Sequence, residues 1–161
     1  MKDIGNYTII NDERIDAHIN KDLEIIVEEI LKEIEYVDCI LLGGGFGRGE
    51  GGVIVTESKI QPVNDYDIYV ITEHKPNFNT INSIRSKLIT LIKIRQIDID
   101  FKTKNELINR NKSVSEYDLK YASKLIYGDS KVLDIMPGFK PEEINLSESL
   151  IPINLYLISI I

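Results

Sequence analysis

The sequence predicts one α/β domain in which a small mixed β-sheet is covered by helices. Apolar residues recur at helical spacing from about Asn20 and again near Thr80, and short strand-like segments follow both stretches. The length of 161 residues suits one domain of ordinary size. A hydrophobic content of 43% and a charged content of 28% are typical of globular proteins and exclude a disordered or collagen-like chain.

The first half of the chain predicts a helix, a buried strand and a glycine-rich segment. The helix is expected to begin at Asn20, whose side chain can accept a hydrogen bond from a free backbone N–H of the first turn. Residues 37–42 are nearly all apolar, as is typical of a strand in the centre of a sheet. The glycine-rich segment spans residues 43–52, and residues 53–63 are expected to form a small edge hairpin or an extended insertion.

The second half predicts two strands and two helices. Residues 65–71 and 97–102 are expected to be strands, separated by a helix that is capped near Asn79 or Thr80. Ser113 and Glu116 have the spacing of a capping box, and the helix that they open is expected to continue through Ile126. Gly128 is the expected stop. The order is thus helix, strand, strand, helix, strand, helix.

We expect residues 1–145 to form the domain and residues 146–161 to form an apolar tail, the possible start of a truncated helical region. The last twelve residues, LIPINLYLISII, are fewer than the roughly 18 apolar residues of a membrane span. An exposed apolar segment often marks an interface, so self-association through the tail is expected. The first residues contain no apolar stretch of a secretory signal, and a cytoplasmic location is expected.

Charge and cysteine content exclude several functional classes. The net charge of -7 disfavours a protein that binds long nucleic acid, because such surfaces are rich in Lys and Arg. The single cysteine, Cys39, cannot form an internal disulfide, and with only two histidines it cannot build a zinc framework. We therefore expect no long nucleic acid as a partner. We also expect no membrane as a partner, because the apolar tail is too short to span one.

The glycine-rich segment predicts a phosphate site. Seven glycines lie between residues 43 and 52, where they let the backbone approach a ligand and point its N–H groups at phosphate oxygens. No Gly-Lys-Ser/Thr follows, which excludes a P-loop. A G-x-G-x-x-G match begins at Gly47, but it starts beyond the tip of the strand and leads into strand-like residues, which disfavours a dinucleotide fold.

Two pairs of aspartates predict a metal site. Asp65 and Asp67 lie on one face of their strand because strand side chains alternate, and Asp98 and Asp100 repeat the pattern on another. Carboxylates that close repel one another unless a cation neutralises them. Mg²⁺ prefers oxygen ligands and completes its shell with substrate phosphates. Two such ions could support an in-line displacement at a bound triphosphate, which predicts transfer of a nucleotidyl group.

Together these residues resemble the polymerase-β-type nucleotidyltransferase superfamily. Its signature is a hydrophobic strand that ends in glycine, then Asp-x-Asp, then a third carboxylate on a later strand. Here these parts are residues 41–45, 65–67 and 97–101. The closer likeness is to the small bacterial and archaeal branch of minimal and aminoglycoside nucleotidyltransferases, whose Gly-Ser-x-Ala-Arg-Gly stretch corresponds to residues 44–49. The resemblance runs from about residue 23 to 128 and implies the nucleotidyltransferase fold.

The resemblance also implies roles for the donor-site residues. Asp65 and Asp67 would bind two Mg²⁺ ions, and Gly44 and Gly45 would contact the triphosphate of ATP or another NTP, with Arg48 near it. Between Gly45 and Asp65 the chain is longer than in most of the family, and we assign the excess to an insertion at residues 53–63.

A third carboxylate would act as metal ligand and as base for the acceptor hydroxyl. Asp100 is preferred, because Thr103 and Leu107 follow it as in the small branch. Asp98 stays open, because Arg95 precedes it in the manner of the DNA-polymerase pattern.

The implied activity is transfer of an NMP group, AMP from ATP in the first instance, to a hydroxyl of a small molecule or protein. One alternative is an antitoxin-like enzyme that adenylylates a partner protein. Another is a non-catalytic nucleotide-binding or interaction module. The intact aspartates favour an enzyme, because an inactive module has no physical need for mutually repelling carboxylates.

Overall fold

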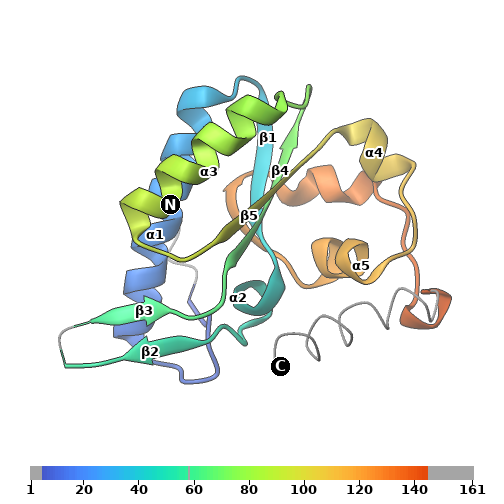
Figure 1. The fold of residues 1–161 in the computed structure, drawn as a ribbon. Coiled ribbons are helices and arrows are strands. Elements are labelled where there is room, and N and C mark those ends of the chain that lie inside the picture. The colour runs from blue at the N-terminus through green and yellow to red at the C-terminus, as the bar shows by residue number, and fades with distance from the viewer. Residues whose placement is uncertain (1–4, 58, 145–161) are drawn as a thin grey trace, which may run out of the picture.

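A four-stranded mixed sheet in the order β5–β4–β1–β6 forms the centre of the computed structural model, which describes residues 5–57 and 59–144 (Figure 1). β1 (Val37–Leu42) runs antiparallel to both of its neighbours, β4 (Tyr66–Thr72) and β6 (Lys124–Gly128). β4 and β5 (Ile97–Lys102) are parallel. The predicted mixed α/β architecture is therefore confirmed.

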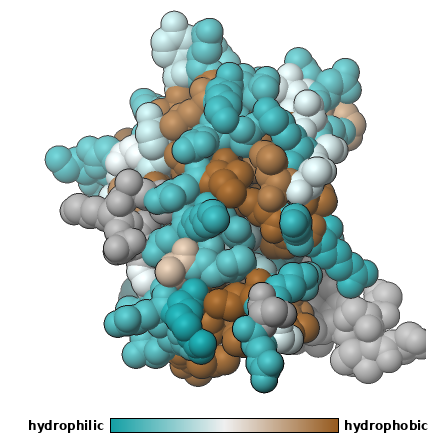
Figure 2. All heavy atoms as spheres, turned by 90° about the vertical axis from the view of Figure 1, so that its left-hand side faces the viewer, coloured by the Kyte–Doolittle hydropathy of each residue, from teal (hydrophilic) through white to brown (hydrophobic). Residues whose placement is uncertain are grey.

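One face of the sheet is covered by two long helices, α1 (Glu13–Glu33) and α3 (Phe78–Ile92) (Figure 1). Alternate strand residues face them, and burial of these apolar side chains provides the main stabilisation of the fold. The strand side chains in this larger core are Ile40, Leu42, Tyr66, Ile68, Val70, Ile97, Ile99, Phe101 and Ile126. Figure 2 views the side with α1, α3 and the hairpin, where hydrophilic side chains separate the areas of exposed apolar surface.

A smaller core lies on the other face of the sheet. The helices α4 (Lys104–Ile108) and α5 (Val114–Tyr121) and the short 3-10 helix η1 (Ser130–Ile135) supply its cover. A further short turn, η2 (Pro141–Glu143), follows. The buried members of this core are Cys39, Leu41, Ile71, Leu107, Leu119, Leu133 and Met136. At the start of β4 and β5 the same face instead carries polar side chains, and the candidate site lies there.

The glycine-rich segment and the hairpin join β1 to β4. α2 (Gly44–Arg48) follows β1, so part of the expected glycine loop is a short helix. β2 (Val53–Val55) and β3 (Ile60–Pro62) form the hairpin predicted for residues 53–63. Its base is closed by the Asn64 side chain, which accepts a hydrogen bond from the Gly52 N–H at 2.7 Å.

The predicted start of the first helix is wrong. α1 begins at Glu13 and is capped by Asp12, whose side chain accepts from the Arg14 N–H at 2.8 Å. Asn20 is instead buried within α1, where its side chain accepts the Tyr7 hydroxyl at 2.6 Å. The side-chain oxygen of an asparagine can cap a helix or accept a hydrogen bond from a buried donor, and that of Asn20 accepts from the buried Tyr7 hydroxyl.

The predicted course of the chain after Ser113 is correct only at its start. Ser113 caps α5 by accepting from the Glu116 N–H, but the helix ends at Tyr121 and residues 124–128 form the edge strand β6. The earlier α3 is capped by Asn77 rather than by Asn79 or Thr80. Pairing with β1 provides the hydrogen bonds that turn residues 124–128 into a strand.

The apolar tail, residues 146–161, lies outside the described residues, and so does the boundary predicted at residue 145. Among the helices of residues 5–57 and 59–144, none combines the length and the apolar character that a membrane span needs.

Candidate active site

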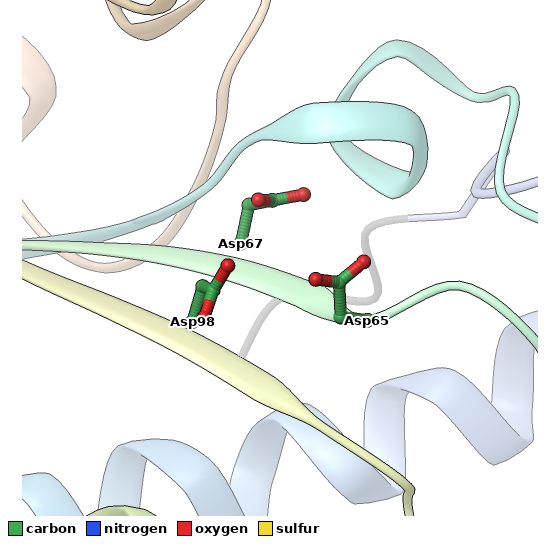
Figure 3. A group of neighbouring side chains, drawn as sticks. All are labelled: Asp65, Asp67 and Asp98. Carbon is green, nitrogen blue, oxygen red and sulfur yellow. The ribbon is translucent and has the colours of Figure 1, made fainter. Parts of the chain in front are cut away.

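Three aspartates converge on the polar part of the second sheet face. Asp65 immediately precedes β4, Asp67 belongs to β4 and Asp98 belongs to β5 (Figure 3). One ligand oxygen from each lies within 4.8 Å of those from the other two. The side chains of Asp65, Asp67 and Asp98 thus form a compact acidic group, which we call the carboxylate cluster.

Strand register explains why these three residues meet. Side chains of β4 alternate between the two faces, so Tyr66 enters the larger core while Asp65 and Asp67 point to the other face. In the parallel pairing of β4 with β5, Asp67 lies opposite Asp98. Residues opposite each other in neighbouring strands share a face, and the carboxylates are therefore brought together by main-chain pairing.

Burial and the repulsion between like charges disfavour the charged form of Asp67 within the carboxylate cluster. The pKa of Asp67 is raised to about 6, first because burial disfavours its charged form and then because Asp65 and Asp98 carry the same charge. The Arg48 guanidinium acts in the opposite direction on this pKa. The Gln96 side-chain amide is 3.5 Å from both Asp65 Oδ2 and Asp98 Oδ1, too far for strong hydrogen bonds. A bound cation would relieve this repulsion.

Asp100 lies on the same face but outside the carboxylate cluster. It is opposite Tyr69 in the register, two residues beyond Asp98 along β5. Its carboxylate pairs with the Lys102 ammonium at 3.0 Å, and Lys102 also contacts Glu116 of α5 at 2.8 Å. A cavity of about 300 Å³ is lined by Asp100 together with Asp67 and Asp98. The geometry thus groups Asp98, and not the preferred Asp100, with the Asp-x-Asp pair.

Gly44 packs directly against the carboxylate cluster. The Gly43 N–H donates to the Asp67 carbonyl at 2.8 Å, which joins the start of α2 to β4. Gly44 has a φ of +57°, and a Cβ built there would lie 1.8 Å from Asp67 Oδ2. Only glycine fits this position without moving the carboxylate.

Gly45 is less constrained. A Cβ there would meet its nearest neighbour, the Gly51 Cα, at 3.7 Å, which is ordinary van der Waals contact. Both Gly44 and Gly45 belong to the first turn of α2, where backbone N–H groups have no partner within the helix. The two glycines predicted to contact phosphate thus lie in the first turn of a short helix, and their contact with phosphate stays a prediction.

Arg48 is held by two carboxylates near the carboxylate cluster. Its Nε lies 3.0 Å from Glu50 Oε2, and its guanidinium also pairs with Asp118 of α5. Asp118 was not among the site residues expected from the sequence, because a single aspartate within a helical stretch carries no signal. The two ion pairs connect α2 to α5 on the side of the sheet where the cluster lies.

The donor set fits Mg²⁺. The three groups are carboxylates, and Mg²⁺ is a hard cation that prefers oxygen ligands. Burial is the first cause of the raised pKa of Asp67, and the charges of Asp65 and Asp98, which Arg48 opposes, are the next.

Comparisons with known proteins give fold-level relatives. No protein-family model matches the sequence, and no curated protein matches it. Among solved structures, a chain from the complex of the tri-AMPylated HEPN toxin with the MNT antitoxin of Shewanella oneidensis matches with a TM-score of 0.50 and 13% identity, over 86% of this chain and 94% of that chain. A toxin–antitoxin structure with AMP-PNP matches with a TM-score of 0.51 and 14% identity, over 85% and 95%.

A third match is the spectinomycin adenyltransferase AAD(9) from Enterococcus faecialis with ATP and spectinomycin, with a TM-score of 0.45 and 18% identity, over 83% of this chain and 62% of that chain. Identities this low concern the fold alone. The first two matches therefore bear on the arrangement of the helices and strands of this chain around its mixed sheet. The chain therefore has the nucleotidyltransferase fold, as the resemblance of its motifs implied.

Proposed function

We propose that this protein is a metal-dependent nucleotidyltransferase that moves an NMP group, AMP from ATP in the first instance, to a hydroxyl of a small molecule or protein. The observation that carries this proposal is the carboxylate cluster on a nucleotidyltransferase fold. The likeness to a structure that contains AMP-PNP supports an adenine nucleotide as donor. A cytoplasmic location, where ATP is available, fits this activity.

Asp65 and Asp67 would hold Mg²⁺, and Asp98 would complete the ligand set. When bound, Mg²⁺ ions would reduce the negative charge on the attacking and leaving oxygens of the displacement. We expect two ions, as the resemblance to the nucleotidyltransferase superfamily implies. The pKa of Asp67 is raised to about 6, and its carboxyl must lose its proton before it can bind a cation.

Asp98 is the residue that we propose as base for the acceptor hydroxyl. It is exposed, whereas Asp67 is partly buried, so an acceptor can approach it from solvent. Asp98 would take the hydroxyl proton while the hydroxyl oxygen forms a bond to the α-phosphorus and pyrophosphate leaves with the electrons of the broken bond. Asp100 is engaged by Lys102 and is better suited to shaping the acceptor side of the cavity.

The backbone N–H groups of Gly44 and Gly45 would contact the triphosphate. They begin α2 next to Asp67, where metal and phosphates would meet. Arg48 would contribute positive charge from a fixed position, since Glu50 and Asp118 hold its guanidinium. The positive charge of Arg48 opposes the rise in the pKa of Asp67, which supports a role for Arg48 beside the carboxylate cluster.

Two acceptor classes remain within this proposal. A protein hydroxyl is supported by the likeness to a complex that contains a tri-AMPylated toxin and its antitoxin. In that version the enzyme is antitoxin-like and adenylylates a partner protein. A small-molecule hydroxyl fits the open cavity beside Asp98 and Asp100 equally well.

Incubation with each α-labelled NTP, Mg²⁺ and a cell extract tests the proposal. Label should pass from ATP to a protein band or to a small-molecule product, and Asp67→Asn should abolish this transfer. Absence of transfer from any NTP, together with absence of nucleotide binding, would favour the non-catalytic interaction module.

A further inference from the structure

A buried hydrogen bond lies directly beneath the carboxylate cluster, on the opposite face of the sheet. Tyr66, the residue between Asp65 and Asp67, is fully buried, and its hydroxyl donates to Asp22 Oδ2 at 3.0 Å. Asp22 belongs to α1 and is itself only 5% exposed. In Figure 3 the three carboxylates rise from one side of the strands while a helix runs along the other.

Asp22 is an expensive residue to bury. Removal of a carboxylate from water costs free energy unless hydrogen bonds or counter-charges compensate, and an apolar residue of similar size is often at least as stable. His18 offers partial compensation, with its Nε2 3.7 Å from Asp22 Oδ2, beyond hydrogen-bond distance. Tyr66 supplies a direct hydrogen bond to this carboxylate. The pair is therefore poorly explained by stability alone.

The start of β4 is the part of the sheet that most needs a fixed position. The ladder between β1 and β4 reaches only to Ile68, opposite Leu42. Beyond it, the side of β4 next to β1 is held by the hydrogen bond from the Gly43 N–H to the Asp67 carbonyl. Three mutually repelling carboxylates sit at this end, and repulsion tends to spread them.

Tyr66 also contacts the other wall of the site. Its ring packs against Phe46 of α2, with 4.9 Å between ring centroids. α2 begins with Gly44, the residue that packs against the Asp67 carboxylate. Tyr66 thus touches α1 through its hydroxyl and α2 through its ring, while its backbone carries the two aspartates.

We infer that Tyr66 and Asp22 are positioning residues of the metal site: the buried hydrogen bond between them fixes the start of β4 and thereby the separation of Asp65 and Asp67. Both side chains are buried on the opposite face of the sheet from the carboxylate cluster, so neither would touch the metal or the nucleotide. The role rests on the proposed function, because the separation matters only if the aspartates share a cation. Groups that hydrogen-bond directly to metal ligands typically change metal affinity by roughly 10- to 100-fold when removed. The Tyr66–Asp22 hydrogen bond acts on the ligands through the backbone of β4, so we expect an effect near the lower end of that range.

The test measures binding of Mg²⁺ with a non-hydrolysable ATP analogue to the folded protein, by calorimetry well below the melting temperature. Tyr66→Phe, which deletes only the hydroxyl, should weaken the Mg²⁺-dependent affinity by about tenfold. Asp22→Leu should have the same effect, and the double variant should be no worse than either single one, because both remove one interaction.

Two further variants separate positioning from general stability. Asp22→Asn keeps an oxygen that can accept the Tyr66 hydroxyl, and it should retain near wild-type affinity. Leu88→Ala in α3 removes packing from the same core and should lower the melting temperature without changing the affinity of the folded protein. In turnover assays, Tyr66→Phe should raise the Mg²⁺ concentration required while kcat at saturating Mg²⁺ changes much less.

Wild-type affinity in both Tyr66→Phe and Asp22→Leu would overturn the positioning role while the proposed function stands. A wild-type protein that binds no Mg²⁺–nucleotide would overturn the proposed function and the positioning role together. If Tyr66→Phe does not fold, the comparison of Asp22→Leu with Asp22→Asn decides the question in the same way.

Discussion

Asp67 is both a proposed metal ligand and the residue of the carboxylate cluster whose pKa is raised. Its burial and its two like-charged neighbours raise its pKa to about 6, well above the ordinary 3.8. A carboxyl whose pKa is higher in the folded state holds its proton more tightly there than in the unfolded chain. Its contribution to stability is therefore lost as pH rises from about 3.8 through about 6, and a bound cation restores it.

Asp67→Asn should remove both the repulsion and the metal response. We expect the melting temperature of the metal-free protein to be equal to or slightly higher than that of wild type at pH 7. Mg²⁺ with ATP should raise the wild-type melting temperature, because a ligand of the native state stabilises it, and should leave the variant unchanged. An undiminished shift in the variant, measured by scanning calorimetry, would contradict the role of Asp67.

Mg²⁺ affinity should rise with pH through the titration of Asp67. The proton must leave before the oxygen can bind, so binding should tighten between about pH 5 and pH 7 and release protons into the buffer. Calorimetry in two buffers of different ionisation enthalpy measures this release. Asp100→Asn, which leaves the carboxylate cluster intact, should keep the same pH profile.

Asp98 and Asp100 should differ in activity. Asp98→Asn removes the proposed base and should lower kcat by about 10²-fold or more, whereas Asp100→Asn should have a much smaller effect. Nucleotidyl transfer at saturating Mg²⁺ and ATP distinguishes the two. The reverse result would restore Asp100 as the third carboxylate.

At the scale of elements, two glycines at the start of α2 connect this helix to β4. Gly43 bonds to the Asp67 carbonyl, and Gly44 occupies a left-handed conformation against the Asp67 side chain. The same glycine-rich segment that is expected to receive phosphate thus also leaves room for the metal ligand. At Gly44 the positive φ and the nearby Asp67 carboxylate leave no space for a side chain.

Gly44 and Gly45 should respond differently to substitution. Gly44→Ala places a methyl group into the Asp67 carboxylate at positive φ and should cost about 1–2 kcal/mol of stability as well as metal binding. Gly45→Val should leave the fold intact, since the space beside Gly45 is open, but should weaken ATP binding steeply. Denaturant unfolding and nucleotide titration of both variants provide the comparison; normal ATP binding by Gly45→Val would reduce the segment to a turn.

At the scale of the whole molecule, one face of the sheet is covered by helices and the other carries the candidate site. α1 and α3 bury the apolar strand residues of one face, and the second face is closed by α4, α5 and η1 only in part. The open part carries the carboxylate cluster. The apolar tail is outside the described residues, and its role remains the prediction of self-association.

Removal of residues 147–161 tests that role. The shortened protein should be a monomer that still binds ATP and Mg²⁺, whereas the intact chain should self-associate or bind a partner through the tail. Light scattering of both proteins measures the difference. A monomeric intact chain, or loss of folding on deletion, would show that the tail belongs to the domain.

The sequence by itself determined the local features of the protein. Alternation placed Asp65 and Asp67 on one face, the apolar run 37–42 became a central strand, and the hairpin at 53–63 formed where the extra residues were expected. Each of these follows from neighbours in the chain, because side-chain alternation and turn formation depend on a few adjacent residues. The start of α1 was also readable, since Ile15 and Ile19 continue the apolar spacing back towards Asp12.

Tertiary structure alone decided which carboxylates meet and where the sheet ends. Asp98 and Asp100 have the same chemistry and lie on the same face, and only the register with β4 sets Asp98 opposite Asp67. Residues 124–128 suit either a helix or a strand, and their pairing with β1 makes them β6. Register and pairing depend on contacts between residues far apart in the chain, and no local pattern contains them.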